Sequence, residues 1–163
     1  MKIRSLLFTD WNEVAAIYRE GILTGIATFE KNVPDWNVWD KSHMNSCRIV
    51  SEIDNKITGW GALTPVSSRC VYAGVAEVSV YIAKDYRGKG IGKKLLEELI
   101  KLSEAEGIWT LQSGIFPENK ASIELHKKVG FRMIGYKEKI GKIDEVWKDN
   151  CLMERRSKIV GVD

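Results

Sequence analysis

A glycine-rich loop between a strand pattern and a helix pattern constrains this chain more than any other segment. The loop spans Arg87–Gly92. Before it, Val78–Ile82 is β-branched and aromatic, which is typical of a strand. After it, apolar residues recur at helical spacing from Ile91 to Leu102. Glycines let backbone N–H groups approach an anion, and the positive dipole end of the following helix lies at the same point. The segment therefore predicts a phosphate-binding loop.

The size and composition are those of one globular domain, which we expect to cover residues 1–163. The chain has 44% apolar and 29% charged residues, and its length allows a substantial core. No apolar run approaches the roughly 20 residues that a membrane helix needs. The apolar part of the N-terminus is too short for a signal peptide. We therefore expect a cytoplasmic protein that does not contact a membrane.

The charges and cysteines exclude several kinds of site. The net charge is only +3, and the basic residues are dispersed, which argues against a nucleic-acid partner. Cys47, Cys70 and Cys151 are far apart and odd in number, so they predict neither a disulfide framework nor a zinc site. We expect three cytosolic thiols and no bound metal.

The remaining patterns give an ordered series of elements. Asp10 is expected to cap the first helix, with Glu13 completing a capping box and Val14, Ile17 and Tyr18 forming the buried stripe. Strands are expected at residues 3–7, 47–53, 57–63, 75–82, 109–115, 131–137 and 145–154, with the last turn at 141–144. Further helices are expected at 34–39, 91–105 and 120–129. This order predicts a protein that combines helices and strands (α/β, or α+β in the stricter classification), with a mixed sheet and helices on both of its faces.

Two other phosphate-binding folds do not fit. A dinucleotide-binding fold would have its glycines after the first strand, whereas here they follow a strand halfway along the chain. A Walker A loop would end in Gly-Lys-Ser or Gly-Lys-Thr, which is absent from the loop.

Two motifs resemble those of the GNAT superfamily of N-acetyltransferases. Arg87-x-x-Gly90-x-Gly92 resembles its pyrophosphate loop, and Asn119–Ser122 followed by Leu125–Phe131 resembles its later motif. The resemblance implies a mostly antiparallel central sheet, acetyl-CoA as co-substrate and a homodimer. It also implies a cofactor-binding set that comprises Val80, Tyr81, Ile82, Arg87, Gly88, Lys89, Gly90, Ile91, Gly92, Lys93, Asn119 and Ser122.

A narrower resemblance concerns the acceptor. The pattern from Arg69 through Tyr72 and Glu77 to Ser79 is similar to that of the phosphinothricin acetyltransferase group, with its methionine sulfoximine and arsinothricin relatives. That group acetylates glutamate-like amino acids. The resemblance implies substrate-side roles for Thr28, Phe29, Arg69, Tyr72, Glu77 and Ser79. Arg69 would suit a carboxylate or phosphinate, because its guanidinium binds such groups bidentately; it could equally be a solvated loop residue.

The chemistry requires a base, because an α-amino group is mostly protonated near pH 7. Glu77 is the candidate base, acting directly or through one water. A backbone N–H near Val80 could donate to the oxyanion. His126 stands where the superfamily often has Tyr; it either protonates the leaving thiolate or only contacts the cofactor.

Two alternatives remain open. The acceptor could be another amine, such as a polyamine, an aminoglycoside or a peptide N-terminus. The chain could also be a sensor that binds acyl-CoA without turnover, although the presence of Glu77 argues against this.

Overall fold

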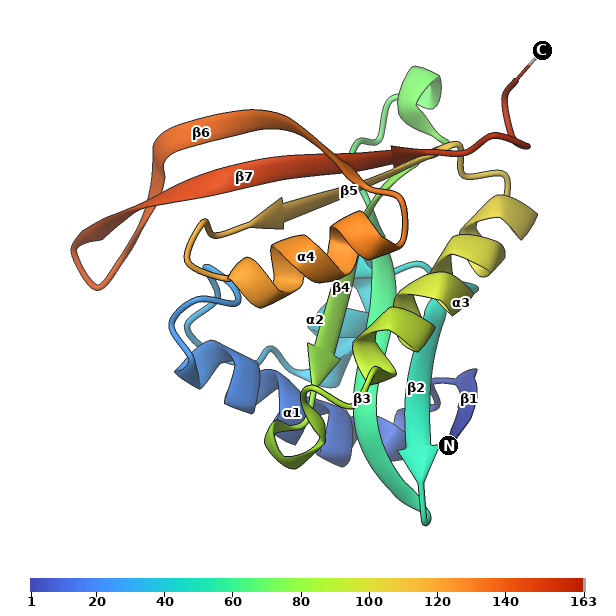
Figure 1. The fold of residues 1–163 in the computed structure, drawn as a ribbon. Coiled ribbons are helices and arrows are strands. Elements are labelled where there is room, and N and C mark those ends of the chain that lie inside the picture. The colour runs from blue at the N-terminus through green and yellow to red at the C-terminus, as the bar shows by residue number, and fades with distance from the viewer. Residues whose placement is uncertain (163) are drawn as a thin grey trace.

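The chain forms one seven-stranded sheet with helices against both faces, as a computed structural model of residues 1–162 shows (Figure 1). Asp163, the last residue of the predicted domain, lies outside the described residues. The strands are β1 (Lys2–Ser5), β2 (Arg48–Ile53), β3 (Lys56–Pro65), β4 (Val75–Ile82), β5 (Thr110–Ile115), β6 (Arg132–Ile143) and β7 (Val146–Arg156). The helices are α1 (Trp11–Leu23), α2 (Trp36–Ser42), α3 (Ile91–Ala105) and α4 (Lys120–Lys128). The predicted order of strands and helices is confirmed.

The sheet is mixed and mostly antiparallel, as predicted. Its strand order is β1-β2-β3-β4-β5-β7-β6. Only β4 and β5 run parallel; the other neighbours pair antiparallel. Within residues 1–162, no helix is long and apolar enough to cross a membrane.

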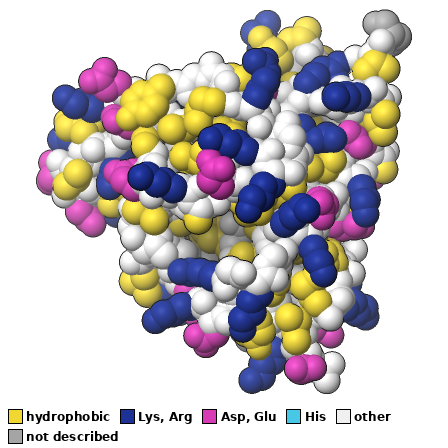
Figure 2. Space-filling model, in the orientation of Figure 1, with side chains coloured by type: hydrophobic (Ala, Val, Ile, Leu, Met, Phe, Trp, Pro, Cys, Tyr) yellow, Lys and Arg dark blue, Asp and Glu magenta, His cyan; other side chains and the backbone are white. Residues whose placement is uncertain are grey.

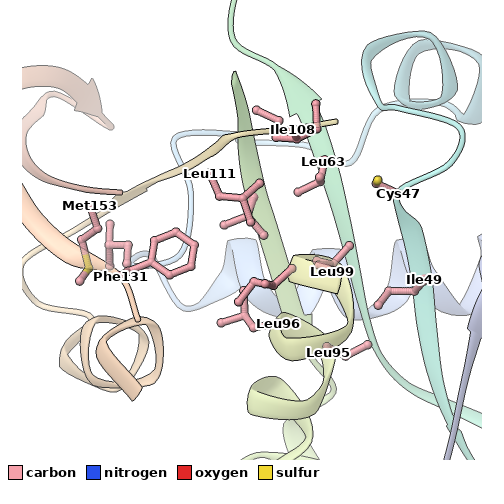
Figure 3. Packing of buried hydrophobic residues seen from close by; sticks show 14 of the residues in the cluster. Cys47, Ile49, Leu63, Leu95, Leu96, Leu99, Ile108, Leu111, Phe131 and Met153 are labelled. Atoms are coloured by element: carbon pink, nitrogen blue, oxygen red, sulfur yellow. The ribbon is translucent and has the colours of Figure 1, made fainter. Parts of the chain in front are cut away.

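Each face of the sheet carries its own apolar core. On one face, the stripe of α3 packs against β2, β3 and β4, with Leu95, Leu96 and Leu99 fully buried (Figure 3). On the other face, α1 and α2 contribute Val14, Tyr18 and Trp39 to a cluster that includes Trp60. Successive side chains of a strand point to opposite faces, so Ala76 and Val78 of β4 belong to the first core, whereas Tyr81 packs against the second.

The two central strands separate after a short paired stretch. Parallel pairing between β4 and β5 covers only Val75–Glu77 on β4 and Thr110–Gln112 on β5. Beyond it, β4 continues beside β3, whereas β5 turns away with β6 and β7 (Figure 1). The sheet is therefore open at its middle, with Glu77 at the point where the strands part.

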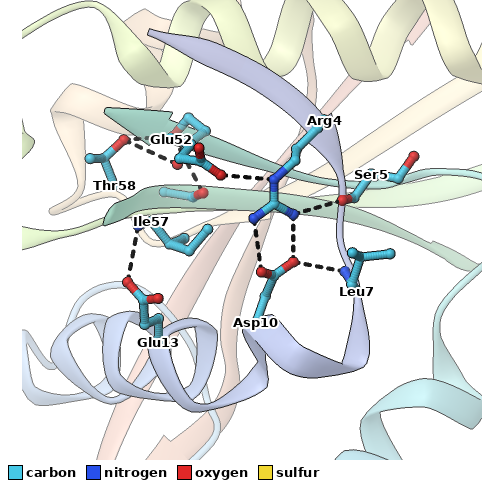
Figure 4. A network of polar contacts seen from close by, with 10 residues as sticks. Arg4, Ser5, Leu7, Asp10, Glu13, Glu52, Ile57 and Thr58 are labelled. Atoms are coloured by element: carbon cyan, nitrogen blue, oxygen red, sulfur yellow. Dashed lines mark hydrogen bonds and ion pairs between the residues drawn. The ribbon is translucent and has the colours of Figure 1, made fainter. Parts of the chain in front are cut away.

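The predicted capping box at the start of α1 is wrong. The Asp10 carboxylate accepts two hydrogen bonds from Arg4, at 2.7 and 2.9 Å, and one from the Leu7 N–H at 2.8 Å (Figure 4). The Glu13 carboxylate accepts from the Ile57 N–H at 3.0 Å. Charge-assisted, bidentate pairing with the Arg4 guanidinium is stronger than a neutral cap and occupies the Asp10 carboxylate, whereas the backbone of β3 occupies the Glu13 carboxylate. Arg4 also holds the pKa of Asp10 below its usual range.

The last hairpin is longer than predicted. The segment 141–144 is not the turn; β6 continues to Ile143, and Asp144 and Glu145 form the turn with φ of 46° and 65°. Two consecutive residues with positive φ are typical of a two-residue hairpin turn. Gly141 has a different role, because a Cβ there would lie 2.7 Å from the Phe29 ring.

Candidate active site

A cavity of about 400 Å³ occupies the opening between β4 and β5. Its wall comes from the loop after α1, from β4 and β5, from α4 and from the β6–β7 hairpin. The molecule is hollowed where that hairpin meets the rest of the chain, and Lys and Arg side chains are spread over the surrounding face (Figure 2). Elements that pack on both faces of the sheet contribute residues to the wall.

Nine of the predicted site residues meet in this wall. They are Thr28, Phe29, Glu77, Ser79, Val80, Tyr81, Asn119, Ser122 and His126. The sequence separates them by nearly a hundred positions, and the parting of β4 and β5 brings them together.

The loop after α1 is attached to the hairpin by its aromatic residue. The Phe29 ring packs on Gly141 and lies edge-on to Phe116, with ring centroids 4.7 Å apart. The adjacent Lys31 pairs with Asp144 in the hairpin turn at 3.0 Å. These contacts fix the loop, and with it Thr28, as one wall of the cavity.

Glu77 lies on the cavity wall with its carboxylate open to the cavity. The wall displaces enough bulk water to raise the pKa of the carboxyl, and the charge of Lys137 partly offsets this effect. A carboxylate that is poorly solvated binds a proton more readily, which suits a general base.

His126 is almost fully buried on the opposite side of the cavity. Its Nδ1 lies 2.8 Å from the Ser122 carbonyl oxygen, which only accepts, so Nδ1 carries the hydrogen. Nε2 is buried without a hydrogen-bond partner among residues 1–162. Burial lowers the pKa of the imidazole. The neutral ring therefore presents a bare nitrogen lone pair.

The edge of β4 that faces β5 carries free backbone groups. The Ala83 N–H donates to the Thr58 carbonyl in line with the β3–β4 register, so odd-numbered residues of β4 bond to β3. Val80 and Ile82 consequently direct their N–H groups toward the opening. The Arg87 Nε donates to the Ile82 carbonyl at 3.1 Å, across the same edge.

A short 3-10 turn, Lys84–Tyr86, joins β4 to the glycine-rich loop. Gly88 and Gly90 have φ of 74° and 79°, a conformation that favours glycine, and a Cβ at either position would meet nothing within 4 Å. The first N–H groups of α3 have no partner within the helix, and no side chain caps them. The loop is thus an open concavity lined by N–H donors. Gly92 differs: it allows close packing, since its Cβ would lie 3.0 Å from Leu125.

The basic residues of the loop have local contacts that leave them accessible. The Lys89 ammonium lies 5.0 Å from the centre of the Tyr86 ring. Lys93 is half exposed and pairs with Glu97 at 3.6 Å. Neither residue lines the cavity, which ends before the loop.

Asn119 caps α4 and also ties it to the loop after α1. Its Oδ1 accepts from the Ser122 N–H at 3.2 Å, and its Nδ2 donates to the Ile26 carbonyl at 3.3 Å. Both ends of the amide therefore have partners within the chain. The capping role is confirmed; a direct contact with the cofactor stays a prediction.

Arg69 and Tyr72 are not brought into the wall. Both belong to an exposed turn between β3 and β4, where the guanidinium carbon lies 5.5 Å from the centre of the Tyr72 ring. Their predicted contact with the acceptor stays a prediction.

Glu30, which follows Thr28 and Phe29 in the predicted substrate-side loop, also lines the cavity. The structure adds two residues that the sequence patterns did not single out, Lys137 and Asn150, and Lys137 is the only Lys or Arg of the wall within residues 1–162. No motif surrounds Lys137 or Asn150, so nothing distinguished them from other polar strand residues. In the part of the chain described, no group of three or more His, Cys, Asp or Glu could hold a metal.

Comparison with known proteins identifies the family. The profile of the acetyltransferase (GNAT) family matches residues 10–131. The chain is 33% identical over 164 residues to a phosphinothricin N-acetyltransferase from Alcaligenes faecalis, covering 94% of this chain and 81% of that protein.

Solved structures agree with this. A GNAT superfamily phosphinothricin acetyltransferase from Sinorhizobium meliloti, in complex with acetyl-CoA, superposes with a TM-score of 0.87 at 26% identity, covering 99% of this chain and 91% of that one. A ribosomal-protein-alanine N-acetyltransferase from Brucella melitensis gives a TM-score of 0.87 at 27% identity, covering 96% and 100%.

The site fits the cofactor that this family uses. Acetyl-CoA carries a pyrophosphate, for which the loop at Gly88–Gly90 offers N–H donors, and an amide-containing arm, for which the edge at Val80 and Ile82 offers backbone partners. The chain belongs to the acetyltransferase (GNAT) family, and it is an N-acetyltransferase with acetyl-CoA as its co-substrate.

Proposed function

We propose that this enzyme acetylates the α-amino group of a small, glutamate-like amino acid, with Glu77 as the general base. The observation that carries the proposal is the position of Glu77 at the parting of β4 and β5, with its pKa raised by the cavity wall. The similarity to a protein named phosphinothricin N-acetyltransferase supports the acceptor class.

In this proposal, different residues bind the cofactor, remove the proton and stabilise the developing charge. Gly88, Lys89 and the start of α3 would hold the pyrophosphate, and the edge of β4 would hold the arm. Bound acetyl-CoA supplies the acetyl group as a thioester. Glu77 takes a proton from the acceptor nitrogen, directly or through one water, so that the nitrogen lone pair becomes available. The N–H of Val80 donates to the acyl oxygen as negative charge develops there. As the C–N bond forms, the C–S bond breaks, and CoA leaves as a thiolate that takes its proton from solvent.

We further propose that His126 acts as a hydrogen-bond acceptor rather than as an acid. Its Nδ1 hydrogen is directed to the Ser122 carbonyl, and its lowered pKa favours the neutral ring at pH 7. Because Nε2 is buried, the ring would turn toward the cavity to accept a hydrogen bond from the cofactor arm or from the product thiol. This is the second of the two roles that the sequence leaves open for His126.

A second acceptor class has one observation in its favour. The wall carries two carboxylates, Glu30 and Glu77, against the single ammonium of Lys137. An acidic wall would suit an amine that carries additional positive charge or a peptide N-terminus. A structurally similar protein is named a ribosomal-protein-alanine N-acetyltransferase, which makes the peptide N-terminus the leading alternative.

The deciding experiment measures thiol release from acetyl-CoA with a panel of acceptors. The panel contains L-phosphinothricin, L-methionine sulfoximine, glutamate, spermidine, an aminoglycoside and an alanine-initiated peptide. We expect turnover with the glutamate-like acceptors. Turnover confined to the polyamine, the aminoglycoside or the peptide would refute the proposed acceptor.

The base is tested in the same assay with Glu77→Gln. We expect kcat to fall by about 10²–10⁴-fold, the range typical of a lost general base. In the unaltered enzyme, kcat/KM should rise with pH through a midpoint above the ordinary glutamate range, because Glu77 must be deprotonated and its pKa is raised. Glu106→Gln, on the exposed end of α3, is the matched control and should leave kcat unchanged. Full activity of Glu77→Gln would exclude this residue as the base.

Three broader features belong to the proposal. We propose that the whole chain acts as one domain, that it is cytoplasmic, and that it confers resistance to its acceptor. The exposed thiol of Cys70 suits a reducing compartment.

We also propose a homodimer, supported by exposed apolar residues on the hairpin, among them Tyr136, Ile140 and Trp147. Light scattering would measure the mass in solution, and a monomer at micromolar concentration would refute the dimer.

A further inference from the structure

Two hydrogen-bond donors stand side by side in the hairpin wall of the cavity. Lys137 on β6 pairs in register with Asn150 on β7, and both side chains line the cavity. Directly paired residues of neighbouring strands share a face of the sheet. Within residues 1–162, Lys137 has no carboxylate within 4.0 Å, and the Asn150 amide has no side-chain hydrogen bond. The pair therefore offers an ammonium and an amide N–H to a ligand.

The register pairing with Asn150 sets the face of Lys137, and a bulge in β6 follows directly after it. Regular pairing stops at Lys137–Asn150 and resumes at Gly141–Lys148, so residues 138–140 stand opposite Asp149 alone. Asp149 fixes the bulge: its carboxylate accepts from the Lys139 N–H at 2.7 Å and from the Tyr136 hydroxyl at 2.5 Å.

The consequence of the bulge is a change in which residues face the cavity. In a regular strand, Lys137 and Ile140 would point to opposite faces, because they are an odd number of positions apart. Here both line the cavity. Bulges that redirect a side chain are frequent beside active sites.

Lys137 is also close enough to Glu77 to influence it. The ammonium charge lowers the pKa of the Glu77 carboxyl against the effect of burial. Because Lys137 is the only Lys or Arg in the wall described, a negative group in the cavity has one cation to bind, and that cation lies near the proposed base.

We propose that Lys137, together with Asn150, binds the α-carboxylate of the acceptor and so makes the enzyme select α-amino acids over amines that lack a carboxylate. The inference rests on the proposed function, in which the acceptor nitrogen lies at Glu77. In an α-amino acid, the nitrogen and the carboxylate are bonded to one carbon, so they lie within about 3–4 Å of each other. An acceptor whose nitrogen is at Glu77 must therefore place its carboxylate near Glu77, on the side where Lys137 stands. The side chain of the acceptor would then contact another part of the cavity wall.

The test compares two acceptors that differ only in this group: L-phosphinothricin and its α-carboxamide. For each enzyme, the ratio of kcat/KM for the acid to that for the amide is measured. Lys137→Met keeps the length of the side chain and removes its charge. We expect this ratio to fall at least 10-fold in Lys137→Met, mainly through a higher KM for the acid, with the amide little affected.

Two further variants define the effect. Lys137→Arg keeps a cation and should retain most of the preference. Lys142→Met removes an exposed lysine from the same strand beyond the bulge and should leave the ratio as in the unaltered enzyme. Comparing each variant with the unaltered enzyme cancels the intrinsic difference in nucleophilicity between the two acceptors.

Several outcomes would overturn the inference. An equal loss for acid and amide in Lys137→Met would mean that Lys137 supports the site without recognising the carboxylate. A shifted pH profile with an unchanged ratio would mean that it acts only through Glu77. If the unaltered enzyme acetylates the acid and the amide equally well, the inference fails and the proposed function stands. If it acetylates only amines that have no carboxylate, both fail.

Discussion

At the scale of single residues, loss of solvation shifts the protonation of two titratable groups in the cavity wall, the solvent-accessible Glu77 and the buried His126. It raises the pKa of Glu77 and lowers the pKa of His126, because in each case the charged form loses solvation. Glu77 therefore binds a proton more readily than an exposed glutamate does, whereas the imidazole of His126 binds one less readily than an exposed histidine does. The arrangement suits proton removal at Glu77 and neutral hydrogen bonding at His126.

The state of His126 has a consequence for stability. A histidine whose pKa is lowered by folding binds protons better in the unfolded chain, so the free energy of unfolding falls as pH drops below about 6.5. The pKa of His43, the only other histidine, is also lowered. Each histidine can contribute a slope of at most about 1.4 kcal/mol per pH unit.

Urea denaturation between pH 7.5 and 5.5 measures this slope. We expect His126→Gln to have a smaller slope than the unaltered enzyme, whatever its absolute stability. Glu77 acts in the opposite sense, because its raised pKa favours proton uptake by the folded chain, so slopes are compared in a Glu77→Gln background. An unchanged slope in the double variant would show that His126 is not held neutral by folding.

At the scale of elements, the glycine-rich loop joins three features that the sequence suggested separately. The free edge of β4, the left-handed turns at Gly88 and Gly90, and the uncapped start of α3 follow one another along the chain. Each exposes backbone N–H groups, so the edge of β4 and the loop form two sets of donors, separated by residues 83–87, most of whose N–H groups bond within the chain. We therefore expect anion binding here to depend on backbone shape more than on Arg87 or Lys89.

Substitution of Gly90 tests the role of this shape. In Gly90→Ala the new methyl meets no atom, so the cost is the left-handed strain alone, roughly 1–2 kcal/mol. We expect stability to fall by that amount and the Kd for CoA, measured by calorimetry, to rise at least 10-fold. Gly135→Ala is the matched control, since its Cβ also enters open space and its φ is not positive. A Gly90→Ala variant with unchanged affinity would contradict a cradle made by the backbone.

At the scale of the whole molecule, the site exists because one sheet opens in the middle and both of its faces are covered. The α1–α2 side contributes the Thr28 loop, and the α3–α4 side contributes His126. The hairpin closes the cavity with Lys137 and Asn150. No single element carries more than a part of the wall, so contacts between distant elements control the geometry of the site.

Gly21 illustrates such a contact. It lies within α1, where alanine would ordinarily stabilise the helix by about 0.5–1 kcal/mol. Its Cβ would lie 2.5 Å from the Tyr81 ring, which is held between Tyr18 and Trp60. We therefore expect Gly21→Ala to destabilise the protein by about 1–3 kcal/mol, as overpacking does. Thermal and urea unfolding would measure it.

Asn12→Ala is the control for the helix itself. Asn12 is exposed on the same helix, and alanine there should stabilise slightly. If Gly21→Ala stabilises as much as Asn12→Ala, the close packing of α1 on β4 is not as tight as the structure indicates.

The order of elements, the buried stripes and the phosphate-binding loop could all be predicted from the sequence. They depend on local periodicity and on glycine, which act within a few residues. The predictions for Val14, Ile17 and Tyr18 and for the stripe of α3 are confirmed. The errors concern contacts made outside the predicted helix and turn: Asp10 bonds to Arg4 and Leu7 before the helix, Glu13 bonds to Ile57 on β3, and Gly141 accommodates Phe29.

The same division applies to the site. By itself the sequence determined the family motifs, the base candidate Glu77 and the loop at Gly88–Gly90, because these are continuous stretches with a fixed chemistry. Only the tertiary structure decided which side chains share the cavity. It left Arg69 and Tyr72 outside the wall and put Lys137 and Asn150 in it. The physical reason is that the parting of β4 from β5 and the bulge at Asp149 arise from pairing between strands, which no local pattern encodes.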